Sequence, residues 1–188
     1  MQSIAPAAAA LLVSALGAPV GGQTPLPFAP GETITYRVNV SGVGTIGRAT
    51  MSVEGPVDVR GTPTYLLRSQ TRAGMGPFKG SQLMESWLDP VMVRSLRFHE
   101  HERRFFRSRN VVTEISPNDR SWADDDGASG ESITSASLDE LSFIYYLRTL
   151  PAGKDTLYEF SSHFDATRNP VTVRESSGGV VQTSSRAY

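Results

Sequence analysis

The chain has 188 residues, with 18 Lys and Arg side chains against 19 Asp and Glu, and a formal net charge of −1. This balance argues against a dedicated nucleic-acid-binding protein, which is usually basic. The absence of cysteine excludes disulfide scaffolds, zinc–thiolate sites, iron–sulfur clusters and cysteine nucleophiles. A charged fraction of 20% and an apolar fraction of 39% are typical of a globular domain.

The N-terminal segment has the pattern of a secretory signal. Residues 1–31 contain no charged side chain, and Ala7–Ala18 form an apolar run that suits a signal peptide but is too short to span a membrane. Val20 and Gly22 stand at positions −3 and −1 of a possible cleavage site. Because no Lys or Arg precedes the apolar run, the alternative is a disordered tail rich in Ala and Pro.

The rest of the chain is long enough for one domain with its own core. We expect a signal peptide at 1–22, a single β-rich domain at 23–175, and a disordered or truncated tail at 176–188. No later stretch reaches the roughly 18 apolar residues that a membrane helix needs. The expected location is therefore the periplasm or the extracellular medium.

Period-two alternation of apolar and polar residues predicts β-strands through most of the domain. In Thr33–Val40, for example, Ile34, Tyr36 and Val38 point to one face. Short strands separated by Gly, Pro and Asp turns indicate an antiparallel sheet. The predicted strands are Thr33–Val40, Thr45–Val53, Thr64–Thr71, Gln82–Leu88, Val93–Phe98, Arg104–Val112, Thr156–Phe164 and Pro170–Arg174.

One segment has helical rather than strand periodicity. Ser137 and Glu140 have the spacing of a capping box, and apolar residues at helical spacing predict a helix over Leu138–Leu147. The Ser-, Asp- and Gly-rich segment Ser116–Ser137 is interpreted as a mobile surface loop. The predicted fold is mainly β: a curved antiparallel sheet or half-barrel of eight or more strands, with one short helix packed on it.

Two short motifs resemble ligand-binding signatures but fit ordinary turns better. Gly42–Gly47 matches the G-x-G-x-x-G fingerprint, but a strand pattern follows it where dinucleotide binding requires a helix, so we expect a hairpin turn. Asp124–Gly127 suggests calcium, but the register of an EF-hand loop would place Trp122 and Ile133 at ligand positions. An acidic solvated loop is the better interpretation.

His99 and His101 form a His-x-His pair flanked by glutamates. In an extended strand both imidazoles would project from one face, at a spacing that could chelate a metal ion. His163 is the only other histidine in the chain, and the same charge pattern is typical of a solvated hairpin tip. We therefore predict no metal site and no cofactor.

Arginines crowd one region of the sequence together with phenylalanines. Such a surface could bind an anionic partner, such as a phosphorylated glycolipid or an acidic polymer, and Arg104, Arg107 and Arg109 are the candidates for it. Alternatively, the region is an exposed face whose arginine stems cover apolar surface. The cluster consists of Arg94, Arg97, Arg103, Arg104, Arg107 and Arg109, with Phe98, Phe105 and Phe106 among them.

Four segments, in this order, resemble a bacterial exported family known as domain of unknown function 3108. They are Pro27–Gly55, with the opening Gly31-Glu32-x-Ile34-x-Tyr36; Glu85–Pro90; Glu102–Arg109; and Leu138–Pro151, which resembles the family's Asp-x-Leu-Ser-x-x-Tyr-x-Leu-Arg helix. The resemblance implies an envelope location and a curved antiparallel sheet with a helix against it, and it supplies no catalytic residues. Family members usually continue for several strands after the position of Arg174, so the resemblance also implies C-terminal truncation.

The leading functional hypothesis is non-enzymatic binding of an apolar or amphiphilic envelope ligand in the concave face of the sheet. Tyr36, Tyr65, Trp87 and Tyr145 are the candidate lining residues, although each could equally belong to the core. A lipid, a glycolipid or an envelope protein is the expected partner, and nucleic acid is not.

Two alternatives remain open. The protein could be a structural or assembly factor that contacts a protein or an anionic polymer through the Arg-rich hairpin. It could also be a hydrolase of envelope polymers, which would require polar groups such as Glu85, Asp89 and His99 to converge.

Overall fold

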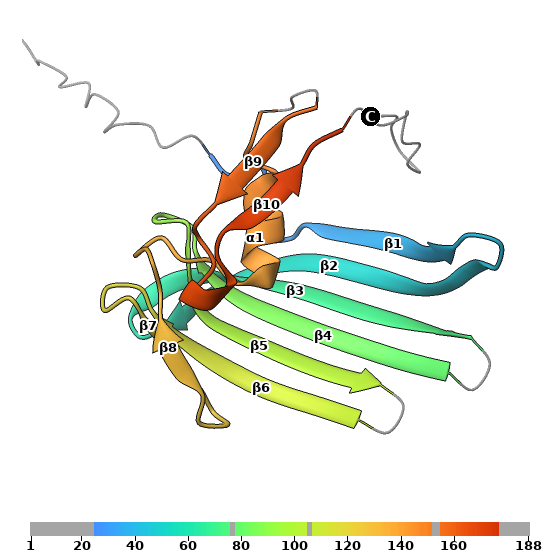
Figure 1. Ribbon diagram of the computed structural model, residues 1–188, viewed down its shortest axis with the longest axis horizontal. Coiled ribbons are helices and arrows are strands. Elements are labelled where there is room, and N and C mark those ends of the chain that lie inside the picture. The colour runs from blue at the N-terminus through green and yellow to red at the C-terminus, as the bar shows by residue number, and fades with distance from the viewer. Residues whose placement is uncertain (1–24, 76–77, 105–106, 152–154, 177–188) are drawn as a thin grey trace, which may run out of the picture.

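The computed structural model describes residues 25–75, 78–104, 107–151 and 155–176, so the predicted signal peptide and nearly all of the predicted tail lie outside it. An antiparallel sheet, in which each strand pairs with its sequence neighbour, dominates the fold (Figure 1). Its strands are β1 (Thr33–Val40), β2 (Gly44–Val59), β3 (Thr62–Met75), β4 (Phe78–Asp89), β5 (Arg94–Arg104), β6 (Arg107–Ser116), β7 (Ser121–Asp124) and β8 (Ser129–Glu131).

A helix and a separate hairpin complete the described structure. Helix α1 (Glu140–Leu147) stands against the sheet, and β9 (Leu157–Phe160) pairs with β10 (Val171–Arg174) through a connection that contains the 3-10 helix η1 (Ala166–Arg168) (Figure 1). The sheet curves and stays open, since β1 and β8 are its two edges. These features confirm the predicted fold class.

No helix among the described residues is long and apolar enough to cross a membrane.

The two faces of the sheet have different surroundings because neighbouring residues of a strand point to opposite sides. Leu67, Ser86 and Phe98 are cross-strand neighbours on β3, β4 and β5, and all three are buried. We call their face, against which α1 packs, the inner face, and the opposite face the outer face. The covered end of the sheet lies beneath α1; the open end carries the β1–β2, β3–β4 and β5–β6 turns (Figure 1).

The hydrophobic core lies between α1 and the inner face at the covered end. Leu141 and Tyr145 of α1 are fully buried there, and the ring of Tyr145 meets that of Phe28 edge-on at 4.9 Å. Burial of this stripe stabilises a helix that is too short to be stable alone. The core consists of Phe28, Val53, Leu67, Leu88, Phe98, Ile115, Leu138, Leu141, Tyr145 and Phe164.

The predicted capping box at Ser137 and Glu140 is wrong, because α1 begins two residues later than predicted. Asp139 is the N-cap: its carboxylate accepts hydrogen bonds from the backbone N–H groups of Leu141 and Ser142, each at 2.9 Å. The Ser142 hydroxyl completes the box by accepting from the Asp139 N–H at 2.9 Å. Glu140 instead forms an ion pair with Arg168.

The segment interpreted as a mobile loop, Ser116–Ser137, contains strands β7 and β8 and extends the sheet. Its acidic residues form hydrogen bonds with β6: Asp124 accepts from the Thr113 hydroxyl and Asp125 from the Val112 N–H. The glycine motif is a hairpin, as predicted, with φ of 79° at Gly42 and 95° at Gly44.

Candidate functional site

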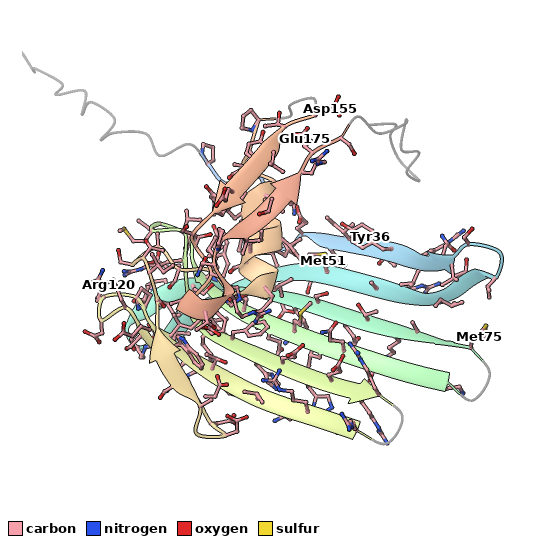
Figure 2. All side chains as sticks on the ribbon, in the orientation of Figure 1. Tyr36, Met51, Met75, Arg120, Asp155 and Glu175 are labelled. Atoms are coloured by element: carbon pink, nitrogen blue, oxygen red, sulfur yellow. The ribbon has the colours of Figure 1, made fainter. Side chains whose placement is uncertain are left out.

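The four aromatic residues predicted to line a ligand site do not share a surface. Tyr145 is fully buried in the core, and Tyr65 is partly buried against it. Trp87 lies on the outer face, where the Arg97 guanidinium stands 5.6 Å from its ring centre. Tyr36 lies partway along β1 on the inner face, where it is 46% exposed (Figure 2).

An apolar band extends along the inner face of β1 to β4, from the edge of the core towards the open end. Cross-strand register places Tyr36 opposite Ala49, and Val38 opposite Gly47. A Cβ atom at Gly47 would lie 2.2 Å from the Arg72 carbonyl oxygen, so only glycine fits this closely packed position. The band consists of Ile34, Tyr36, Val38, Ala49, Met51, Ala73 and Met84, interspersed with small polar residues.

A charged band continues the same face on β5 and β6. Glu102 forms an ion pair with Arg104, and Glu100 one with Arg109 at 3.2 Å. Arg107 is exposed and has no carboxylate partner among the described residues. The predicted anion-binding arginines of this hairpin are therefore largely neutralised, while Phe105 and Phe106 lie outside the described residues.

On the outer face, a row of alternating charges crosses β2 to β5. Arg68 reaches Glu54 on one side and Glu85 on the other, both at 2.8 Å. Glu85 also contacts the Nδ1 atom of His99 at 2.9 Å. Burial raises the pKa of Glu85, but the hydrogen bonds from His99 and Arg68 outweigh it and lower the pKa below its usual value.

The environment of His99 favours its charged form. Its Nε2 atom lies 3.0 Å from the Asn110 side-chain oxygen, so both ring nitrogens face oxygen atoms. Burial lowers the pKa of His99, but the hydrogen bonds to Asn110 and Glu85 and the charge of Glu85 raise it above 6.5 overall.

The two histidines project from one face of β5, as the His-x-His spacing predicts, but they lie within the strand rather than at a hairpin tip. The Nδ1 atom of His101 lies 2.9 Å from the same Asn110 oxygen that contacts His99. No group of three or more His, Asp and Glu side chains in the described part of the chain could hold a metal ion.

Only two of the three candidate hydrolase residues meet. Glu85 and His99 are in contact, whereas Asp89 lies four residues along β4, about 14 Å away at the rise of an antiparallel strand. Asp89 instead shapes the β4–β5 turn by accepting from the N–H groups of Val91 and Met92 at 3.0 and 3.1 Å. Both nitrogens of His99 are occupied, so neither activates a hydroxyl nucleophile among the described residues.

A buried polar network joins α1 to the middle of the sheet. The Ser86 hydroxyl donates to the Asp139 carboxylate at 2.5 Å, and the hydroxyls of Ser95 and Ser142 are 2.7 Å apart. Burial raises the pKa of Asp139 to about 6, against the opposing effect of its hydrogen bonds from Ser142 and Ser86. Asp139 has no exposed surface, so the network orients α1 and cannot touch a ligand.

A second contact joins the other end of α1 to the start of the sheet. The Arg148 guanidinium donates to both carboxylate oxygens of Glu32, at 2.6 and 2.9 Å, and this pairing raises the pKa of Arg148. The same guanidinium lies 5.5 Å from the ring centre of Phe28 and 5.4 Å from that of Tyr145.

The sequence motifs thus have structural roles that can be assigned residue by residue. The Gly-Glu opening supplies Glu32, and the helix motif supplies Asp139, Ser142, Tyr145 and Arg148. Sequence reasoning missed Ser86 and Ser95, which look like ordinary strand residues until the helix is placed. A sequence profile described as "Protein of unknown function (DUF3108)" matches residues 33–186. No curated protein and no solved structure matches the chain.

Proposed function

The chain belongs to the family described as "Protein of unknown function (DUF3108)", and we propose that it is a non-enzymatic binding protein of the cell envelope with an amphiphilic ligand. The observation that carries this proposal is the division of the inner face at the open end into an apolar band and a charged band. An amphiphile has the same division, since its tail needs apolar contact and its head needs polar or charged partners.

The apolar band is accessible to a ligand tail. Tyr36 is 46% exposed, although it is apolar enough to favour burial. Ala49 and Ala73 have small side chains, which leaves room above the backbone of β2 and β3. A tail placed there would bury this surface against the side of α1.

The charged band suits the head of the same ligand. Arg107 offers a free guanidinium, and Glu100 and Glu102 balance the charges of Arg109 and Arg104. A phosphate or carboxylate head can therefore bind Arg107 without facing an unpaired carboxylate.

Two observations support a non-enzymatic role. The polar residues of the helix motif are used to cap α1 and hold it on the sheet. The Glu85–His99 pair lies on the opposite face from the two bands, and its histidine is fully engaged.

Binding of a fluorescent fatty-acid probe to the purified protein tests the proposal. Ala49→Asp places a charge in the apolar band and should weaken probe binding more than tenfold, because a carboxylate resists burial against a tail. Thr50→Asp is the matched control, since it adds the same charge to the next residue of β2, on the outer face.

Circular dichroism of both variants checks that the sheet persists. Equal probe affinity in the two variants and the wild type contradicts the proposal, as does a wild-type protein that neither binds the probe nor releases lipid on solvent extraction. Fractionation of cells that produce the full chain tests the proposed envelope location separately.

The alternative of an assembly factor acting through the Arg-rich hairpin has less support. Of its three candidate arginines, Arg104 and Arg109 are paired with Glu102 and Glu100, so only Arg107 remains to attract an anionic polymer.

A further inference from the structure

Four arginines form a single row across the outer face of the open end. Arg37 is directly opposite Arg48, and Arg48 is directly opposite Arg72. Ser81 follows on β4, and Arg103 lies opposite Ser81 on β5. At about 4.8 Å per strand, the row extends about 19 Å across the sheet. We call these four residues the arginine row.

Within the described structure, nothing neutralises the arginine row. All four side chains are exposed, and none forms an ion pair or a side-chain hydrogen bond with another described residue. The adjacent row towards the covered end is also free of acids; its members are Thr35, Thr50, Gln70, Leu83, His101 and Asn110. Because like charges opposite each other destabilise a sheet, this arrangement does not serve the fold.

A depression of about 590 Å³ lies at one part of the row. Arg72, Lys79 and Arg103 stand around it, while Gly74 and Gly80 contribute no side chains. Three cationic side chains therefore surround a shallow depression, and the two glycines leave its base without side chains. Guanidinium groups bind phosphate oxygens through paired hydrogen bonds, so this space suits a phosphate group.

Exposed apolar residues lie just beyond the row, at the tips of the sheet. Val40 and Val43 flank the β1–β2 turn and are 42% and 54% exposed, and Met75 at the end of β3 is 56% exposed (Figure 2). Figure 1 shows the β1–β2 turn and the end of β3 at the same end of the sheet. Met75 is three positions after Arg72 on β3, which corresponds to about 10 Å along a strand.

We propose that the open end of the sheet docks on an anionic lipid bilayer. Val40, Val43 and Met75 enter the interface, and the arginine row binds lipid phosphates. Apolar groups of interfacial segments reach roughly 5–10 Å into the headgroup and acyl boundary, which matches the separation of the tips from the row. Each arginine near a negatively charged leaflet is attracted to it, so the charge of the row complements this surface. The surface is distinct from the inner-face ligand site.

Co-sedimentation with vesicles of equal parts phosphatidylcholine and phosphatidylglycerol tests the proposal. The double variant Arg48→Gln/Arg72→Gln should bind about 25-fold more weakly, at about fivefold per arginine. The matched control is Arg120→Gln/Arg174→Gln, which removes the same charge from exposed residues away from the open end (Figure 2) and should bind like the wild type. Equal losses in the two double variants overturn the proposal.

Two further measurements separate a membrane from other anionic partners. Met75→Ser should weaken vesicle binding several-fold, because an inserted apolar group is lost. Wild-type binding should also be much weaker to phosphatidylcholine alone. If soluble polyphosphate binds as tightly as the mixed vesicles and Met75→Ser has no effect, the row recognises a soluble polyanion and membrane docking is overturned. The Arg48→Gln/Arg72→Gln variant should retain the probe affinity of the inner-face site.

Discussion

At the covered end of the sheet, the buried carboxylate of Asp139 is surrounded by hydrogen-bond donors, whereas at the open end four arginines share a row without a carboxylate. The first arrangement satisfies the groups it buries and stabilises the fold. The second leaves repulsion that an added partner could relieve. The difference separates the part of the molecule that maintains the fold from the part that is available for binding, and each prediction below tests this division.

The largest effect is expected at the N-cap of α1. Asp139→Ala should lower the free energy of unfolding by about 3 kcal/mol, because it removes the cap and leaves the buried Ser86 hydroxyl without its acceptor. Urea denaturation of the purified variant measures this loss. A loss below 1 kcal/mol would mean that the covered end does not depend on its buried network.

The conservative variant Asp139→Asn isolates the charge. The pKa of Asp139 is about 6 in the folded protein, above the value of about 3.9 in an unfolded chain. The folded state therefore holds an extra proton between these values, and the contribution of this group to stability is full below pH 4 and is lost as the pH rises through 6. Asp139→Asn should flatten this part of the stability profile; an unchanged profile would assign the pH dependence to another group.

A smaller loss is expected where α1 contacts the start of the sheet. Arg148→Met should cost about 1.5 kcal/mol, since it removes a two-oxygen ion pair with Glu32 and the stacking on Phe28. A double-mutant cycle with Glu32→Gln should give a coupling energy of about 1 kcal/mol. Additive losses would show that the two groups stabilise the fold independently.

The Glu85–His99 pair lies between the two ends of the sheet, and we expect it to contribute less to stability than the contacts of α1. In a ¹H–¹⁵N titration, the pKa of His99 should lie above 6.5 and should fall in Glu85→Gln, because the carboxylate favours the imidazolium. Since the folded pKa is raised, the stability from this group is present below pH 6.5 and lost as the pH rises through the folded pKa. A His99 pKa that is identical in both proteins would rule out this coupling.

The smallest expected change in stability is a gain, in contrast to the losses described above. Arg48→Gln should stabilise the isolated protein by about 0.5 kcal/mol, because it removes like-charge contacts with Arg37 and Arg72 on both sides. Thermal unfolding at low salt measures the gain, which should shrink as salt screens the row. Destabilisation by this variant would indicate that the row supports the fold after all.

Period-two alternation identified the strands of the sheet because one face of each is apolar at the covered end. The bounds of Thr33–Val40 were predicted without error. The pattern failed towards the open end: β5 continues through His99 and His101 to Arg104, where both faces are polar or charged and the alternation disappears. Ser116–Ser137 failed for a related reason, since β7 and β8 are too short to show a period.

The candidate sites depended on distant contacts that local patterns do not contain. Ser137 and Asp139 are both good N-cap residues. Asp139 is the N-cap because it forms hydrogen bonds with Ser86 of β4 and Ser95 of β5. The arginine row required the register of five strands, because its members span 66 positions of the sequence, from Arg37 to Arg103. The arginine cluster visible in the sequence contributes only Arg103 to this row, and two of its other members, Arg104 and Arg109, are neutralised by Glu102 and Glu100.

The strictly sequential order of the eight strands bears on how the polypeptide assembles. Each strand can add to the one that precedes it as the chain is synthesised, because its pairing partner is already present. Glu32 and Arg148, however, are 116 positions apart, so their contact forms only after almost the whole ladder has been made. A nascent chain interrupted before Arg148 would contain a sheet with exposed edges and would lack the Glu32–Arg148 contact. This is the form most prone to aggregation and proteolysis.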